Sequence, residues 1–310
     1  MNCVLIGMPV ADGAGRAGAD AGPRALRAAG IREALQATGV AVHDRGNLAL
    51  GEARPEAGAH PNPALKALSE VAAWTAAIAD AVSAVPHGQV PVMLGGDHSI
   101  SMGTLTGLSR RAAAMGRPLF VLWIDAHPDC HTLDTTESGH LHGTPVAYAL
   151  GVDGFGKAFP AVTQTLAPSH LCMIGLRSID AAEASLIARL GIEAHAAAAL
   201  TRQGVAATLE PFLERVRAAN GLLHVSFDAD AIDPSEAPGV GTPVADGLSL
   251  GEARAIMATV RRSGLLASLD LVEVNPFLDR DRRTARLMAS LAADAIDARS
   301  RDCGNRRASA

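Results

Sequence analysis

Near its middle the chain reads Leu122-Trp123-Ile124-Asp125-Ala126-His127-Pro128-Asp129. These residues continue an apolar run from position 118 that has no polar face, as is typical of a central strand in a parallel sheet. In an extended segment Asp125, His127 and Asp129 point the same way, because side chains alternate along a strand. Open α/β sheets bind ligands at the carboxyl ends of their strands. The stretch therefore predicts a buried strand that presents three potential metal ligands at such an end.

Two other apolar runs end in the same manner. Residues 92–94 lead into Gly95-Gly96-Asp97-His98-Ser99, and residues 222–227 lead into Asp228-Ala229-Asp230. The three ends together offer four carboxylates and two imidazoles: His98, Asp125, His127, Asp129, Asp228 and Asp230. Crowded carboxylates raise one another's pKa unless cations neutralise them, and four of them suit two divalent ions better than one. Oxygen-rich ligation with some imidazole favours Mn²⁺ over metals that prefer thiolate.

Segments with strand and helix character alternate along the whole chain. Strands are predicted at residues 2–9, 40–43, 90–94, 118–124, 171–175, 191–195, 222–227 and 265–274. Helices are predicted from Pro23, after Ser99, and at 63–84, 145–150, 180–190, 204–219, 249–262 and 282–298. Such alternation implies a parallel sheet with helices on both faces. We expect an α/β fold, a three-layer α/β/α sandwich with a mostly parallel sheet of about eight strands.

Composition narrows the domain organisation and the functional class. The chain has 310 residues, 48% of them hydrophobic, and a formal net charge of -5. We expect one domain at residues 1–298 and a polar, basic, solvated tail at 299–310. The lack of a basic stripe argues against nucleic acid as a partner.

Four scattered cysteines fit neither a disulfide framework nor a zinc cluster: Cys3, Cys130, Cys172 and Cys303. With no signal peptide and no membrane-length apolar run, we expect a soluble, cytoplasmic protein with no membrane partner.

A glycine-rich loop near the start of the chain raises an alternative function. Gly13-Ala14-Gly15-Arg16-Ala17-Gly18 fits G-x-G-x-x-G, and Asp44 lies roughly where a ribose-binding acid belongs in a dinucleotide site. That fingerprint requires the following helix to begin inside the loop. Here Pro23 is best placed in the first turn of the helix, several residues too late. An NAD-dependent oxidoreductase is therefore the less favoured interpretation.

Seven motifs follow one another in a distinctive order. They are Gly95-Gly96-Asp97-His98-Ser99, Asp125-Ala126-His127-Pro128-Asp129, Ser138-Gly139-His140-Leu141-His142-Gly143, Gly175-Leu176-Arg177, residues 226–234, Gly241-Thr242-Pro243 and Glu273-Val274-Asn275-Pro276. In this order they resemble the arginase/agmatinase family of ureohydrolases, and arginases most closely. The resemblance covers nearly the whole chain and implies the arginase/deacetylase-like fold.

The resemblance also implies an activity. It is the hydrolysis of L-arginine to L-ornithine and urea, by attack of a metal-bridging hydroxide on the guanidinium carbon, with two Mn²⁺ per subunit in a homo-oligomer, a trimer or hexamer. Agmatine and guanidinobutyrate remain alternative guanidino substrates. A catalytically inactive relative that acts as a binding or regulatory subunit is a further alternative, which the complete set of potential metal ligands disfavours.

The family pattern assigns metal ligands and catalytic residues by position. One ion is expected on His98, Asp125, Asp129 and Asp228, and the other on Asp125, His127, Asp228 and Asp230, so that Asp125 and Asp228 bridge. Asp129 is expected to accept the proton of the nucleophile. Glu273 resembles the guanidinium-binding glutamate, and His142 resembles the histidine that returns a proton to the leaving amine. The alternatives are a surface carboxylate for Glu273 and a structural role for His142. His195 and His224 receive no functional role.

The far end of the substrate is expected to lie against a polar loop and two acids. The residues predicted to bind substrate are His131, Thr136, Ser138, His140, Asp180, Glu183 and Thr242. His131 and His140 stand where many arginases have asparagine, so imidazole would replace an amide at both positions. Solvated loop histidines are the alternative for both.

Overall fold

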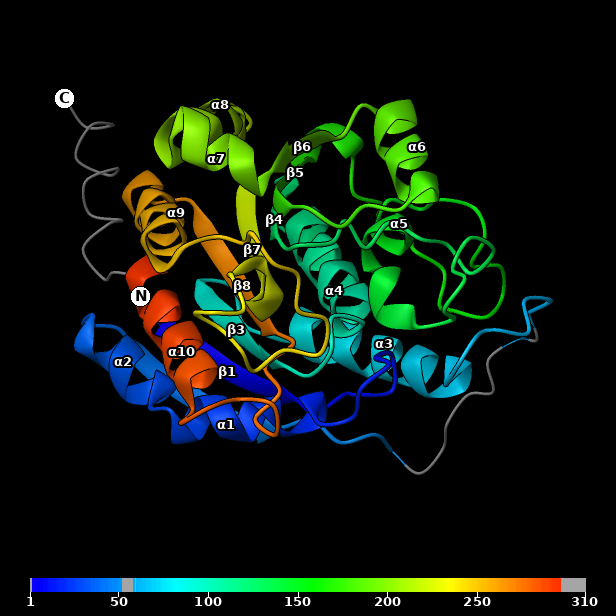
Figure 1. Cartoon of the computed structure of the whole chain (residues 1–310), viewed down its shortest axis with the longest axis horizontal. Coiled ribbons are helices and arrows are strands. Elements are labelled where there is room, and N and C mark those ends of the chain that lie inside the picture. Colours follow the sequence, from blue (N-terminus) through cyan, green and yellow to red (C-terminus); the bar gives the residue numbers. More distant parts are fainter. Residues whose placement is uncertain (1, 52–57, 59, 297–310) are drawn as a thin grey trace.

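The sheet of this protein has eight strands, all of them parallel. The computed structural model describes residues 2–51, 58 and 60–296 (Figure 1). The strand order is β2-β1-β3-β8-β7-β4-β5-β6. The strands are β1 (Asn2–Met8), β2 (Ala41–Asn47), β3 (Gln89–Gly95), β4 (Leu119–Ile124), β5 (Leu171–Leu176), β6 (Glu193–Ala196), β7 (Leu222–Asp228) and β8 (Leu266–Val272). The predicted strand number and parallel arrangement are confirmed.

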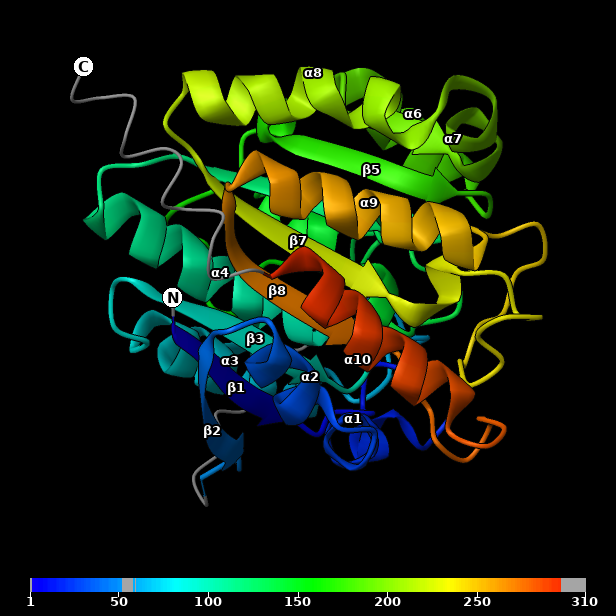
Figure 2. The same cartoon turned by 90° about the vertical axis from the view of Figure 1, so that its left-hand side faces the viewer.

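Helices cover both faces of the sheet, as the alternating pattern predicts (Figures 1 and 2). One layer contains α1 (Gly22–Ala28), α2 (Ile31–Ala37), α7 (Ala197–Gln203), α8 (Val205–Ala218), α9 (Leu250–Ser263) and α10 (Arg283–Ala295). The other contains α3 (Leu68–Ser83), α4 (Ile100–Ala114), α5 (Pro145–Ala149) and α6 (Ala181–Leu190). Short 3₁₀ helices are η1 (Ala19–Ala21), η2 (Leu141–Gly143), η3 (Pro168–His170) and η4 (Ala229–Ala231). The architecture is a three-layer α/β/α sandwich.

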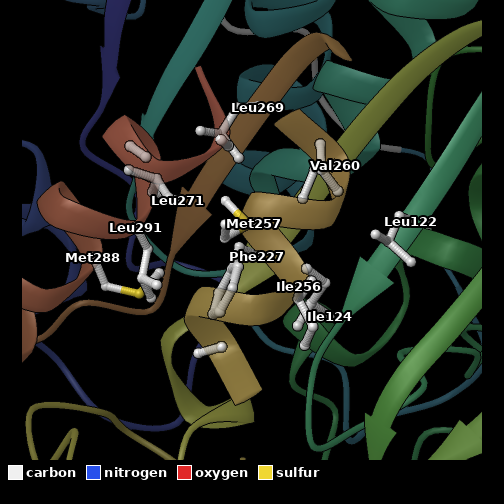
Figure 3. Close-up of a cluster of buried hydrophobic side chains, with 14 of the residues drawn as sticks. Leu122, Ile124, Phe227, Ile256, Met257, Val260, Leu269, Leu271, Met288 and Leu291 are labelled. Atoms are coloured by element: carbon white, nitrogen blue, oxygen red, sulfur yellow. The ribbon is translucent and has the colours of Figure 1, made fainter. Parts of the chain in front are cut away.

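Each face of the sheet has its own hydrophobic core, and β4 contributes to both. Leu122 and Ile124 pack with Phe227 and the α9 side chains in the core drawn in Figure 3. Val121 and Trp123 belong to the core on the opposite face. Burial of each such side chain contributes about 1.5–3 kcal/mol. A strand that is apolar on both faces is therefore held in the middle of the sheet, and its carboxyl end is fixed there.

The helix predicted over residues 63–84 begins at Leu68 instead. Ala67 has a left-handed backbone, with φ of 48°. The segment before it binds a loop: the Lys66 N–H donates to the Gly139 carbonyl, and the Asn62 amide donates to the Leu133 and Thr136 carbonyls. Residues 62–66 thus brace the polar loop at 133–139 rather than extend the helix. This long-range pairing leaves no trace in local helical periodicity.

Other boundaries differ in smaller ways. The helix predicted from Pro23 is two helices, because Gly30 between them is left-handed with φ of 85°. The helix α7 was not predicted, and β2 extends to Asn47. The predicted tail at 299–310, with Cys303, lies outside the described residues.

The glycine-rich loop at 13–18 packs against the loops that contain Asp97 and His140 and does not form the start of a helix. The helix α1 begins at Gly22, with Pro23 in its first turn as predicted. The Gly13 N–H donates to Asp97 Oδ2 at 2.8 Å. A Cβ on Gly15 would lie 2.6 Å from Cε1 of His140. Asp44 is paired with Arg27 at 2.8 Å. The dinucleotide interpretation is wrong, because these glycines allow close approach to protein and the acid is already bound.

Gly96 lies where the ends of β1, β3 and β8 meet, and Gly96→Ala tests this close approach. A Cβ there would lie 1.9 Å from the carbonyl oxygen of Val10, which is backbone and cannot rotate away. We expect a loss of about 1–3 kcal/mol in the free energy of unfolding, measured by urea denaturation. Gly51→Ala is the control, because a Cβ on Gly51 would meet no atom within 4 Å. Equal stabilities of the two variants would contradict this account.

Candidate active site

Four adjacent strands deliver the candidate site residues to one edge of the sheet. In the strand order β3, β8, β7 and β4 are neighbours. His98 follows β3, Glu273 follows β8, Asp228 ends β7 and Asp125 follows β4. The long loop after β7 lies at the end to which the β7 arrow points in Figure 2. Motifs far apart in the sequence therefore meet at the carboxyl ends of parallel strands, where ligands of open α/β sheets bind.

The first group of potential ligands surrounds His98. Its Nδ1 lies 3.0 Å from Asp125 Oδ2, 3.2 Å from Asp129 Oδ2 and 3.1 Å from Asp228 Oδ2. The ring is buried, and Nδ1 has no partner in hydrogen-bond geometry within the described part of the chain. A buried nitrogen that faces three carboxylate oxygens without such a bond fits a cation between them. The structure thus brings the first predicted ligand set together.

The second group is built around the other oxygen of Asp125. His127 Nδ1 lies 3.4 Å from Asp125 Oδ1 and 3.2 Å from Asp230 Oδ2. Asp125 therefore faces both imidazoles, as a bridging ligand would. Asp228 differs, because its Oδ1 accepts the N–H of Asp230 at 2.7 Å while its Oδ2 faces His98. Its bridging role stays a prediction.

Three of these carboxyl groups have raised pKa values, because they are buried and lie close to one another. Burial, followed by the charge of Asp125, raises the pKa of Asp129 to about 7. Burial and the neighbouring charges of Asp230 and Asp125 raise the pKa of Asp228 well above its usual value. Burial and Asp125 also raise the pKa of Asp230. Oxygen-rich groups that repel one another in this way suit hard or borderline divalent cations.

Trp123 orients two of these ligands, which the sequence did not indicate. Its ring stacks on that of His98 with centroids 4.1 Å apart and planes 4° apart. Its indole N–H donates to Asp125 Oδ2 at 3.1 Å. One fully buried side chain therefore fixes an imidazole and a carboxylate together. The apolar run at 118–124 predicts its burial but not this role.

Arg177 ties the surrounding loops together. Its guanidinium donates to the carbonyls of Asp230, Ala231 and Val244, at 2.6, 3.1 and 2.8 Å. It thereby joins the loop after β5 to the segment that follows β7. The Gly-Leu-Arg motif was visible in the sequence, but its structural role depends on contacts across the sheet.

Two site residues have strained backbones. Asp129 has φ of 50° and Glu273 has φ of 61°. Non-glycine residues rarely adopt positive φ, and such strain gathers at functional sites. At both positions the turn follows a strand end and lies beside the ligand groups.

His142 and Glu273 form a pair across 131 positions of sequence. His142 Nδ1 lies 2.9 Å from Glu273 Oε1, which also accepts the His98 N–H at 2.9 Å. Burial lowers the pKa of His142, but the hydrogen bond to Glu273 together with the charges of Glu273, Asp97 and Asp129 outweighs burial and raises the pKa to about 9. Glu273 is 3% exposed, so the surface-carboxylate alternative is wrong. The Gly13 carbonyl accepts the His142 N–H at 3.1 Å and fixes its backbone.

An open pocket lies over the metal-ligand groups. Four of the predicted substrate residues line it: His131, Asp180, Glu183 and Thr242. His131 Nε2 lies 3.0 Å from Asp180 Oδ2, so this imidazole faces the acids. Glu183 is buried and accepts the N–H groups of Cys130 and Asp180. Thr242 donates to Asp230 Oδ2 at 2.9 Å.

Three other predicted substrate residues are not among those that line the pocket. Thr136 Oγ1 accepts the Gly139 N–H, and Ser138 Oγ accepts the His140 N–H. His140 Nε2 lies 2.9 Å from Lys66 Nζ. These contacts shape the loop beside the pocket, and substrate contact by the three side chains stays a prediction.

Comparison with known proteins supplies the family. A sequence model described as "Arginase family" matches residues 1–297. The chain belongs to the arginase family. An arginase of Brucella melitensis biotype 1 is 48% identical, over 96% of this chain and 96% of its own. The solved arginase of Bacillus caldovelox matches with a TM-score of 0.84 and 34% identity, over 95% of this chain and 97% of that chain. The arginase of Entamoeba histolytica in complex with L-ornithine matches with a TM-score of 0.83 and 27% identity, over 95% and 98% of the two chains.

The family membership confirms the resemblance read from the seven motifs. Within residues 2–51, 58 and 60–296 no helix is both long and apolar enough to cross a membrane.

Asp228→Ala tests the ligand groups of this arginase-family site. The change removes the oxygen 3.1 Å from His98 Nδ1, so we expect the Mn²⁺-loaded protein to lose at least one bound ion per chain. Metal content is measured by elemental mass spectrometry after gel filtration. Asp80→Ala is the matched control, because the Asp80 side chain is 80% exposed on α3. Unchanged metal content in the Asp228 variant would exclude this carboxylate as a ligand.

Proposed function

We propose that this protein is an arginase that hydrolyses L-arginine to L-ornithine and urea. The observation that carries the proposal is one pocket that combines two clusters of side chains with two further acids. Each cluster has one imidazole and two carboxylates, and the further acids are Asp180 and Glu183. A cationic substrate suits such a pocket. The relationship to arginases over nearly the full length supports the same activity. The complete ligand groups argue against a catalytically inactive relative.

We propose two Mn²⁺ ions as the cofactor. One would be held by His98, Asp125, Asp129 and Asp228, and the other by Asp125, His127, Asp228 and Asp230. Bound divalent ions lower the pKa of water and so supply a nucleophile at neutral pH. The absence of thiolate from the groups around His98 and His127 supports Mn²⁺ over zinc bound in thiolate sites.

Protein groups around the site handle the protons. The family pattern implies that Asp129, whose carboxylate lies beside His98, accepts the proton of the attacking water. With a pKa of about 9, His142 is protonated at neutral pH and can donate to the leaving amine. Glu273 holds His142 in place, and the family pattern implies that it also binds the guanidinium.

The far end of the substrate would be bound by the pocket wall and the neighbouring loop. Asp180 and Glu183 suit the α-ammonium group, and His131 lies against both, at 3.0 and 3.8 Å. Thr136, Ser138 and His140 remain proposed contacts of the α-carboxylate. Thr242 would act beside the guanidinium through its bond to Asp230.

A homo-oligomer, a trimer or hexamer, and a cytoplasmic location are also proposed. Phe277 is 72% exposed and offers an apolar contact for such an assembly. The buried free thiols of Cys130 and Cys172 fit a reducing compartment.

A substrate panel read out by urea release tests the proposed function. L-Arginine should exceed agmatine in kcat/KM by roughly 10²-fold or more, because buried polar groups left without partners reject a truncated substrate by up to ~10⁴-fold. The control is the same protein treated with a chelator, which should release no urea. Equal cleavage of agmatine or guanidinobutyrate would leave a ureohydrolase but not an arginase.

Asp180→Asn sharpens the same panel. The amide keeps the size and the helix-capping ability of the aspartate at the start of α6 while it removes the charge. L-Arginine should lose more kcat/KM than guanidinobutyrate, which has no α-amino group. An equal loss for both substrates would place the α-ammonium elsewhere.

His142→Ala tests proton delivery. We expect kcat to fall by roughly 10²–10⁴-fold, the usual range for a general acid, while metal content stays unchanged. Added imidazole should restore part of the activity. His87→Ala is the control, because His87 is exposed in the turn before β3. An unchanged kcat would make His142 a structural residue.

A further inference from the structure

A buried polar cluster lies behind the metal-ligand groups, between α4 and the sheet. All five of its side chains are 0% exposed: Ser101, His224, Ser226, Ser268 and Asp270. In the register of β7 and β8, Ser226 lies beside Asp270 and His224 lies beside Ser268. Burial of such groups is costly, and Oδ1 of Asp270 has no hydrogen-bond partner there. Apolar residues would be the more stable choice in this position, which suggests a role beyond packing.

The contacts in this cluster form a chain that ends on His98. Ser101 Oγ donates to Asp270 Oδ2 at 2.9 Å. Ser226 Oγ lies 3.5 Å from Ser101 Oγ, and His98 Nε2 lies 2.8 Å from Ser226 Oγ. The 3.5 Å contact is the weakest of the three. The chain therefore connects a buried carboxylate to the nitrogen of His98 that faces away from the ligand group.

The chemistry of its end group fixes the direction of this chain. The hydroxyl of Ser101 gives its hydrogen to Oδ2 of Asp270, since a carboxylate oxygen accepts hydrogen bonds. Ser101 is then free to accept from Ser226, and Ser226 is free to accept from His98 Nε2. In a neutral imidazole with its hydrogen on Nε2, the lone pair is on Nδ1. That lone pair faces Asp125, Asp129 and Asp228, where a cation is expected.

His224 supports the carboxylate at the end of the chain. Its Nδ1 lies 2.9 Å from Ser268 Oγ, and its Nε2 lies 3.5 Å from Asp270 Oδ2. A ring whose Nδ1 accepts from Ser268 carries its hydrogen on Nε2, which lies near Asp270 but makes no hydrogen bond in the described part of the chain. The imidazole thus lies beside the same carboxylate oxygen that accepts from Ser101, and Oδ1 of Asp270 stays without a hydrogen bond among the described residues.

We propose that Ser226, Ser101 and Asp270 are positioning residues that select the Nδ1 ligand form of His98, and that His224 supports Asp270. The inference rests on the proposed metal centre. Residues that orient a ligating histidine typically change metal affinity or activity by 10–100-fold when they are replaced. The effect should be confined to the ion held by His98, because His127 has no contact with this chain among the described residues.

Ser101→Ala tests the proposal, since it breaks the chain at a side chain that contacts no predicted metal ligand. Mn²⁺ affinity is measured by titration against a fluorescent chelator, together with the unfolding temperature of the metal-free protein. We expect one binding step to weaken by about 10–100-fold. Ser109→Ala is the matched control on the same helix, and Ser101→Thr keeps the hydroxyl and should restore most of the affinity.

The outcomes separate the positioning role from the proposed function. Tight Mn²⁺ binding by the wild type, with one weakened step in Ser101→Ala alone, supports the role. Wild-type affinity in Ser101→Ala overturns the role and leaves the metal centre intact. Equal loss in Ser109→Ala, or a fall in the metal-free unfolding temperature that accounts for the whole effect, also overturns it. No Mn²⁺ binding by the wild type removes the metal centre and the role together.

Discussion

Repulsion among four carboxylates is the constraint on which the site depends. Asp125, Asp129, Asp228 and Asp230 are all nearly excluded from water, and three of them have raised pKa values. Two imidazoles relieve only part of this repulsion. Groups held so close must be kept there by the rest of the fold, because their own interactions favour separation. The fold therefore holds the four carboxylates together against their mutual repulsion. Bound cations would attract all four and so replace this repulsion by a net attraction.

The order of the strands in the sheet holds these groups together. The strand β8 lies between β3 and β7, so Glu273 emerges between His98 and Asp228. There it accepts the His98 N–H and pairs with His142, which joins the ligand group to the proposed proton donor. Two hydrophobic cores clamp the same strands from both faces. The positive φ angles of Asp129 and Glu273 are tolerated because the strands on which they depend cannot shift.

Sequence reasoning succeeded where the chemistry is local. Alternation along the Asp125 to Asp129 segment places three potential ligands on one side, and apolar runs mark buried strands, so the fold class and the six potential ligands could be predicted. Their division between two ions was implied by the family resemblance. It failed where a contact joins distant segments. Neither the brace from Asn62 and Lys66 to the loop at 133–139 nor the pairing of His142 with Glu273 has a local signal. His224 was assigned no role because its partners, Ser268 and Asp270, lie on a neighbouring strand.

The side chains at the two ends of the pocket are held in place to different degrees. At the metal end, the potential ligands His98 and Asp125 are both held by Trp123, which stacks on His98 and donates to Asp125. At the far end, Asp180 is 75% exposed on its side chain and its described side-chain ion pair is with His131. An imidazole in place of an amide can be accommodated there. The reason is that Lys66 and Asn62, and not the potential metal ligands, hold the loop at 133–139 in place. Variation in substrate preference is thus possible at the rim without any change at the carboxylates.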